Sequence, residues 1–220
     1  MHIVIWGEVS NSLTQGGLGI RRIRDMNACL LLKWRWKFGT QVNFLWRRSI
    51  CSKYNIDEAS WHPPLKSSYK HSRDWKDILS IGIHSTNVYN FYIDNCQIQV
   101  GDGSRIKDRH DRWSGSSSLK SSFPLLFNLS TDKEGSLQQF MARKSSPNNW
   151  NFPIRRVLFS GELVEEANLL GLLSSAPSLS IDRADHLIWA SASTSPGGFS
   201  VSSLYSASNS ILGPHSNICK

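Results

Sequence analysis

A glycine-rich turn followed by a long apolar period is the feature that most constrains how this chain folds. Residues 16–19 hold three glycines, and glycine adopts positive φ without a Cβ clash, so we expect a turn there. Residues 21–38 then follow a helical period with two apolar stripes. The stronger stripe consists of Ile23, Met26, Leu30, Leu31, Trp34 and Phe38, and the weaker one of Cys29, Leu32 and Trp36. The pattern predicts a helix over 21–38 that is packed on both sides and ends with Gly39 as its C-cap.

Other stretches predict more helices and a few short strands. Val42, Leu45, Trp46 and Ile50 have helical spacing, so the first two helices form an αα-hairpin. Helices are also expected over 75–83, 136–143 and 160–173, and a last short one near residue 201. Residues 97–100 and 104–107 flank Gly-Asp-Gly, which is typical of a β-hairpin. Residues 187–189 and 199–201 are a second candidate strand pair.

These elements together predict an α+β fold that is mostly α, with helical hairpins, a small β-hairpin and further short helices. The expected segments are 1–56 (glycine turn and basic helical hairpin), 57–95 (loop and short helix), 96–130 (β-hairpin and polar loop), 131–206 (helical linker) and 207–220 (unstructured tail). A length of 220 residues is sufficient for one domain or two small ones.

The net charge of the chain favours a polyanionic partner. It is +8 at pH 7 with a pI near 9.5, and RNA or DNA is the commonest partner of such a surface. The arginines that lie on or beside the two first helices are the candidates for phosphate contacts: Arg21, Arg22, Arg24, Arg35, Arg47 and Arg48. Tryptophans beside them would stack on unpaired bases if exposed. The alternative is that the tryptophans form the core and the arginines only a solvated rim.

Several classes of protein are excluded by the same composition. The four cysteines are scattered without a C-x-x-C pair, so neither a zinc finger nor a disulfide framework is predicted, and we expect reduced thiols. Residues 1–10 do not resemble a signal peptide, and no apolar run reaches the length of a membrane span. We therefore expect an intracellular protein that needs no cofactor, metal or small-molecule substrate.

No set of residues predicts catalysis. Residues 92–95, Tyr-Ile-Asp-Asn, resemble the paired-aspartate turn of a polymerase palm but have asparagine at the second carboxylate, so we interpret the match as coincidence. Asp102, Asp108, His110 and Asp111 have the residue types of a metal site, but basic residues alternate with them, which favours a solvated, charge-balanced loop. No nucleophile with a nearby base has a local signature.

Several phrases in order resemble one family. They include Gly-Gly-Leu-Gly-Ile-Arg at 16–21, Leu-Leu-Leu-Lys-Trp at 30–34, Leu-Trp-Arg-Arg at 45–48, Val-Gly-Asp-Gly-Ser-Arg-Ile at 100–106 and Gly-Phe-Ser-Val at 198–201. Together they are similar to the connector of plant LINE-type (non-LTR) retrotransposon reverse transcriptases, between the polymerase domain and the zinc-binding region. The resemblance covers most of residues 2–206 and implies template handling by a segment that carries no catalytic carboxylate.

The departures from that family imply a truncated or decayed copy. Asp108-Arg109 stand where the family usually has Phe-Trp, which replaces two core aromatics by charges. The family's polymerase motifs and zinc ligands have no counterpart in these residues. We therefore expect a non-enzymatic fragment with weak, sequence-independent RNA or DNA binding. The alternatives are a protein-interaction module that uses exposed tryptophans, or a relic without function.

Overall fold

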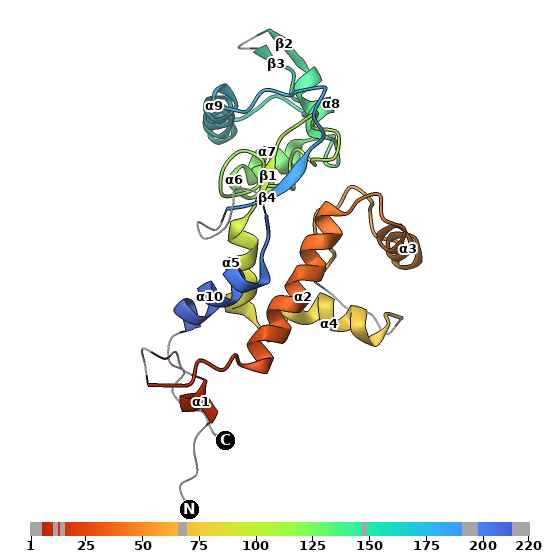
Figure 1. Cartoon of the computed structure of the whole chain (residues 1–220). Helices are drawn as coiled ribbons and strands as arrows, with labels where there is room; N and C mark the ends of the chain where they lie inside the picture. The colour runs from red at the N-terminus through yellow and green to blue at the C-terminus, as the bar shows by residue number, and fades with distance from the viewer. Residues whose placement is uncertain are drawn as a thin grey trace, which may run out of the picture. The chain divides into compact units, whose positions relative to one another are not determined.

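The computed structural model describes residues 6–10, 13, 16–65, 70–146, 149–190 and 198–212, and shows a mostly helical α+β fold (Figure 1). Two compact units make up the chain. Unit 1 comprises Met1–Cys96 together with Trp189–Lys220, and unit 2 comprises Gln97–Ile188. Unit 2 is therefore inserted in the sequence of unit 1, a division that the expected segments did not include.

Unit 1 is helical in its described part. Its helices are α1 (Trp6–Val9), α2 (Ile23–Thr40), α3 (Leu45–Tyr54), α4 (Arg73–His84), α5 (Thr86–Asn95) and α10 (Val201–Leu212). Helix α2 packs against α4, α5 and α10, and α5 also contacts α4 and α10. Residues 201–212 thus complete a helical assembly begun far earlier in the chain, and α10 extends into the segment expected to be unstructured from residue 207.

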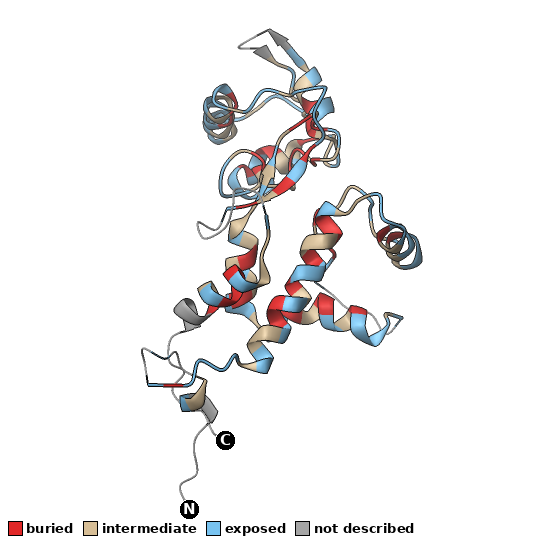
Figure 2. Cartoon of the chain, viewed as in Figure 1, coloured by how far each residue is buried: buried red, intermediate tan, exposed pale blue. Residues whose placement is uncertain are grey.

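The main core of unit 1 lies where α2, α5 and α10 meet (Figure 2). Tyr92 and Leu204 are fully buried there, and Trp189 packs on Tyr92 with ring centroids 6.0 Å apart. The Phe199 ring centroid lies 5.0 Å from that of Trp189, and the Phe199 ring stacks on Trp36 with centroids 5.4 Å apart. Large aromatic side chains dominate such cores because each removes a wide apolar area from water. Aromatic contacts therefore join the two sequence segments of unit 1.

Helix α2 buries the apolar stripe that was ranked second more completely than the stronger one. Cys29 and Leu32 are completely buried, whereas in the stronger stripe Phe38 is completely buried but Ile23 is 80% exposed. Both stripes have helical spacing, and only the positions of α5 and α10 decide which one faces the core. The expected C-cap is also wrong: α2 passes through Gly39 and has Gln41 as its C-cap, whose backbone N–H donates to the Lys37 carbonyl.

Unit 2 contains short helices, two-stranded sheets and long irregular segments. Its elements are β1 (Cys96–Gln99), α6 (Leu119–Ser122), α7 (Pro124–Leu129), α8 (Leu137–Ala142), β2 (Lys144–Ser146), β3 (Asn149–Trp150), α9 (Ser160–Ser174) and β4 (His186–Trp189). The antiparallel pair β2–β3 is the small hairpin of the fold. Both β1 and β4 extend across the boundary between the units by one residue.

The strands β1 and β4 pair with each other, which corrects two expected pairings. Residues 104–107 do not form a strand opposite β1, and Val201 begins α10 rather than a strand opposite β4. The Gly-Asp-Gly segment wraps around Asp185 instead. The Asp185 carboxylate accepts hydrogen bonds from the backbone N–H groups of Gly101 (2.7 Å), Gly103 (3.0 Å) and Arg105 (3.1 Å). The Asp185 carboxylate, which is distant in sequence, thus holds this segment in place of the expected hairpin pairing.

Glycine is required at both ends of this segment. A Cβ on Gly101 would lie 2.2 Å from the Arg183 carbonyl oxygen, and Gly103 has a φ of +72°. Any residue other than glycine is therefore excluded at position 101 by a steric clash, and at position 103 it would have a strained backbone conformation.

Asp185→Asn should destabilise the protein by about 1–3 kcal/mol, because the amide keeps one oxygen for Gly101 and Gly103 but turns a donor toward Arg105. Urea unfolding followed by circular dichroism measures the loss. Asp182→Asn, at an exposed aspartate nearby in sequence, is the control and should change stability by less than about 0.5 kcal/mol. Equal stability of the two variants would contradict the role of Asp185.

Two helices of unit 2, α8 and α9, begin within one residue of the positions that the sequence predicts. The Ser136 hydroxyl accepts from the Gln139 backbone N–H at the start of α8, and the Gln139 Oε1 accepts from the Ser136 N–H, which completes a capping box. Glu162 accepts from the Phe159 N–H at the start of α9 and forms an ion pair with Arg156 at 2.7 Å. Helix α9 nevertheless keeps Leu163 and Val164 exposed. Within the described residues, no helix has the length and apolar character to cross a membrane.

Candidate nucleic-acid interface

The structure divides the six candidate arginines into two groups. Arg21, Arg24 and Arg48 are exposed, and Arg22 is half-buried. The Arg21 guanidinium lies 5.5 Å from the Tyr205 ring centroid, and the Arg22 Nε donates to Ser10 Oγ at 2.7 Å. Arg21 and Arg22 precede the first turn of α2, which starts at Ile23. These four side chains remain candidates for phosphate contacts.

Arg35 belongs to the second group, because it is fully buried. Its Nη atoms donate to the carbonyl oxygens of Pro63 (2.6 Å) and Ile78 (3.2 Å), and its guanidinium lies 5.4 Å from the Tyr89 ring centroid. Burial lowers the pKa of Arg35 from its usual value. The side chain fastens the loop before α4 to α2, and we correct its assignment from a phosphate ligand to a structural residue.

Arg47 is the second buried arginine and also requires correction. Its Nε donates to the Phe38 carbonyl at 2.6 Å, and Nη2 donates to the carbonyls of Glu58 (2.8 Å) and Ser60 (3.2 Å). The Phe38 carbonyl is among the last four of α2, which have no partner within the helix. The arginine fork thus caps α2 and holds the 58–60 loop, while its plane covers the Phe38 ring at 4.6 Å.

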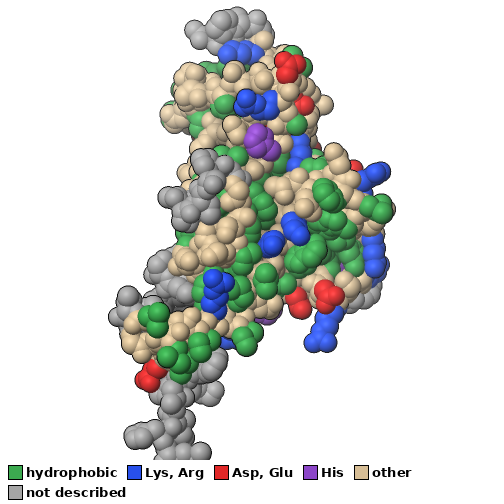
Figure 3. Space-filling view, viewed as in Figure 1, with side chains coloured by type: hydrophobic (Ala, Val, Ile, Leu, Met, Phe, Trp, Pro, Cys, Tyr) green, Lys and Arg blue, Asp and Glu red, His purple; other side chains and the backbone are tan. Residues whose placement is uncertain are grey.

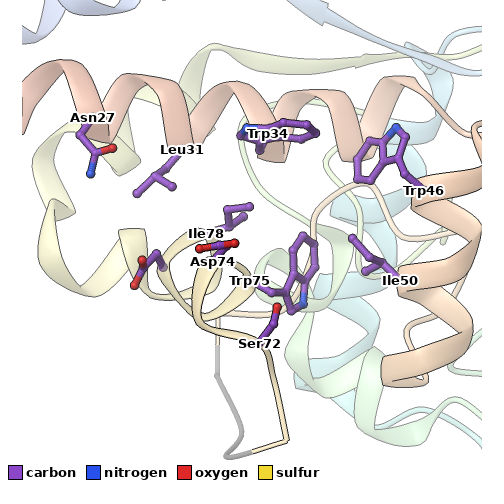
Figure 4. Close-up of a pocket in the computed structure, with 10 residues that line it drawn as sticks. Asn27, Leu31, Trp34, Trp46, Ile50, Ser72, Asp74, Trp75 and Ile78 are labelled. Carbon is purple, nitrogen blue, oxygen red and sulfur yellow. The ribbon is translucent and has the colours of Figure 1, made fainter.

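A cavity of about 510 Å³ lies between α2, α3 and α4 (Figure 4). We call it the tryptophan groove because its walls are Trp34 from α2, Trp46 from α3 and Trp75 from α4. Trp34 and Trp46 meet edge to face with centroids 5.5 Å apart, and Trp34 is 44% exposed. The sequence pattern places Trp34 on the stronger stripe of a helix packed on both sides; the structure shows instead that Leu31 and Trp34 of this stripe line an open groove.

Charges surround the tryptophan groove unevenly. Asp74 and Asp77 of α4 belong to its lining, and no Lys or Arg does. Figure 3 shows hydrophobic side chains gathered over the region of α2, α3 and α4, with acidic side chains at the edge near α4. The Lys37 Nζ lies 4.7 Å from the Trp34 ring centroid. Anionic phosphates are disfavoured beside the two aspartates, so the groove and the exposed arginines differ in the ligands that they suit.

The residues of the candidate metal loop do not converge. Asp102 accepts from Ser104, Asp111 accepts from the Lys107 N–H, and the His110 Nε2 faces Glu134 at 3.2 Å. In the part of the chain that the structure describes, no three His, Cys, Asp or Glu side chains are placed to hold a metal ion. The side chains whose spacing suggested a metal cluster therefore each have a separate local partner.

The interpretation of this loop as solvated is wrong for Asp108 and Arg109. Both are buried, with exposures of 1% and 6%, and the Arg109 Nε lies 3.4 Å from the Asp108 Oδ2. Neither oxygen of the Asp108 carboxylate accepts a hydrogen bond, whereas its backbone carbonyl accepts one from the Trp113 Nε1 at 2.7 Å. Burial raises the pKa of Asp108 to about 7, against the opposing effect of the Arg109 charge. Two charges thus occupy the interior positions that the family resemblance assigns to aromatics.

The polymerase-like tetrapeptide lies within helix α5. Tyr92 is fully buried in the core, and the Asn95 side-chain amide donates to the Phe91 carbonyl one turn earlier. Burial raises the pKa of Tyr92 well above its usual value. Asp94 is exposed on the helix, so these residues do not form a turn that presents carboxylates. Cys29, Cys51 and Cys96 form no disulfide in the part of the chain that the structure describes, and His215 and Cys219 lie outside it.

Comparison with known proteins gives one informative similarity. Over 116 residues, 51% of this chain, the sequence is 32% identical to an Arabidopsis thaliana protein provisionally named ribonuclease H protein. The match covers 17% of the length of that relative, so this chain corresponds to a small part of it. No protein-family model matches the chain, and no solved structure resembles it significantly. The similarity connects half of the chain with a plant protein named for action on nucleic acid.

Proposed function

We propose that this chain is a non-catalytic, transposon-derived fragment that binds RNA or DNA without sequence preference through the exposed basic residues of unit 1. The observation that carries the proposal is the similarity of half the chain to a plant protein named as a ribonuclease H. The ordered phrases described above agree with it and give the finer assignment, a connector of a LINE-type reverse transcriptase. The net charge of +8 supports a polyanionic ligand.

The basic residues that remain available are consistent with phosphate contacts. Arg21, Arg24 and Arg48 are exposed, and Lys33 and Lys53 add further exposed positive charge on α2 and α3. Such side chains bind a phosphate backbone by releasing counterions, which gives affinity without base recognition.

A triple variant of the exposed arginines tests the proposal. Arg21→Gln, Arg24→Gln and Arg48→Gln together should weaken binding to a labelled single-stranded RNA at least tenfold at low salt. They should also reduce the slope of log K against log salt by about 2, since each phosphate contact on a single strand contributes about 0.7. Fluorescence anisotropy at several salt concentrations measures both quantities, and circular dichroism on the same samples verifies folding.

The control removes the same charge from exposed sites of unit 2. Lys120→Gln, Arg155→Gln and Arg183→Gln have the same net charge as the first variant and should keep most of the slope. Equal losses in the two triple variants would show that only the total charge matters, which contradicts an interface on unit 1. A folded protein without affinity for RNA at low salt would refute nucleic-acid binding altogether.

A further inference from the structure

The tryptophan groove has the construction of a site for an organic cation. Its aromatic walls come from three different helices, so the cavity exists only when α2, α3 and α4 are packed together (Figure 4). Trp46 is held in place by a hydrogen bond from its Nε1 to the Gln41 Oε1 at 3.2 Å. Trp75 is 4% exposed and stacks on Tyr54, with centroids 6.2 Å apart and planes 5° from parallel. Two of the walls are therefore fixed before any ligand arrives.

The chain itself shows that these rings accept a positive charge. The Lys37 ammonium lies over the Trp34 ring at 4.7 Å, within the range in which the negative face of an indole attracts a cation. Tryptophan is the strongest of the aromatic partners for this interaction. Trp34 also keeps 44% of its surface exposed after contact with Lys37 and Trp46. An additional cation can therefore reach the aromatic surface of the groove.

The carboxylates of the groove provide the complementary charge. Asp74 and Asp77 both line the cavity, one turn apart on α4, and no cation among the described residues forms an ion pair with either of them. An arginine side chain suits this combination, because its weakly hydrated plane stacks on an indole while its N–H groups donate to carboxylates. Ile78 and Leu31 add apolar contacts for the methylene stem or for neighbouring apolar residues.

We propose that the tryptophan groove docks an extended segment of a partner protein by an arginine side chain, which stacks on the exposed surface of Trp34 beside Trp46 and pairs with Asp74 and Asp77. This site is distinct from the exposed arginines of the proposed nucleic-acid interface and goes beyond it. A single-stranded RNA would place its phosphates beside the two aspartates, so the observed charges favour a cationic protein segment.

The peptide acetyl-Leu-Arg-Leu-amide is a direct probe, with acetyl-Leu-citrulline-Leu-amide as its neutral isostere. Titration of the full chain, followed by NMR of the indole N–H groups, should show binding of the arginine peptide that shifts the Trp34 and Trp46 signals. We expect the citrulline peptide to bind at least tenfold more weakly. Equal binding of the two peptides would overturn the proposal.

Variants test whether the groove itself is responsible. Asp74→Asn with Asp77→Asn should weaken binding of the arginine peptide about tenfold. The matched control Glu58→Gln with Asp182→Asn, which removes the same charge at exposed positions elsewhere, should leave the affinity within about twofold. Equal effects of the two pairs would refute the site. If single-stranded RNA shifts the same indole signals and the peptide does not, the groove is a nucleic-acid site and the proposal is wrong.

Discussion

Arg47→Ala should destabilise unit 1 by about 3–5 kcal/mol, although the substitution removes a residue type that is normally exposed. The buried guanidinium bonds the carbonyls of Phe38, Glu58 and Ser60, and hydrogen bonds from a charged donor are worth about 1.5–3 kcal/mol each. Alanine would leave the Phe38 carbonyl unpaired at the end of α2 and remove the contact with the Phe38 ring. The loss should appear in urea unfolding followed by tryptophan fluorescence.

The neighbouring residue is the natural control for this experiment. Arg48 is exposed and adjacent, so Arg48→Ala should change stability by less than about 0.5 kcal/mol. Arg47→Lys should restore little, because one ammonium group cannot reproduce the planar fork that reaches both the end of α2 and the 58–60 loop. If Arg47→Ala and Arg48→Ala were equally stable, the capping role of Arg47 would be refuted.

Raising the pH from 4 to 8 should reduce the contribution of Asp108 to the free energy of unfolding by about 4 kcal/mol. Burial raises the pKa of its carboxyl from 3.8 to about 7, so the folded state holds a proton that the unfolded state has released. The stability contributed by the protonated form is complete below pH 3.8 and is lost as the pH rises through 7. Each pKa unit corresponds to about 1.36 kcal/mol.

Asp108→Asn isolates this effect from all other titrating groups. The amide has a similar shape and does not ionise, so the wild type should be less stable than the variant at pH 8 and should approach it at pH 4. Urea unfolding of both proteins across this pH range gives the difference directly. A difference that is independent of pH would show that Asp108 does not carry the burial penalty.

The periodic pattern of the sequence predicts the longer helices other than α5, but not their buried faces. Spacing located α2, α3, α4, α8 and α9 within a few residues, because each carries an apolar stripe or a capping residue that is readable locally. It could not rank the two stripes of α2, since Leu32 and Trp34 are both apolar and the choice depends on distant partners. Helix α5 was not predicted because it is rich in Asn, β-branched and aromatic residues, which have weak helix propensity, and α1, α6 and α7 are too short to show a periodic pattern.

Long-range pairings account for the other errors. Nothing near Gly101 indicates that Asp185 will accept its N–H, and nothing near β1 identifies β4 as its partner. Arginine is mostly exposed in proteins, so the burial of Arg35 and Arg47 was not expected from residue type. The alternation of arginine with tryptophan was the available signal: a guanidinium that is flanked by apolar positions on a helix is suited to interior carbonyls as well as to phosphates.

The insertion of unit 2 has a consequence for the order in which the protein folds during synthesis. All of unit 2 is synthesised before Trp189, Leu204 and Tyr205, which the core of unit 1 requires. Tyr92 and Leu32 must therefore remain without their final partners while the whole of unit 2 is translated. Domains generally fold as units while the chain emerges. Unit 2 is a continuous segment that needs no later residues for its fold, whereas helices α2–α5 expose apolar surface until Trp189 and α10 have been made.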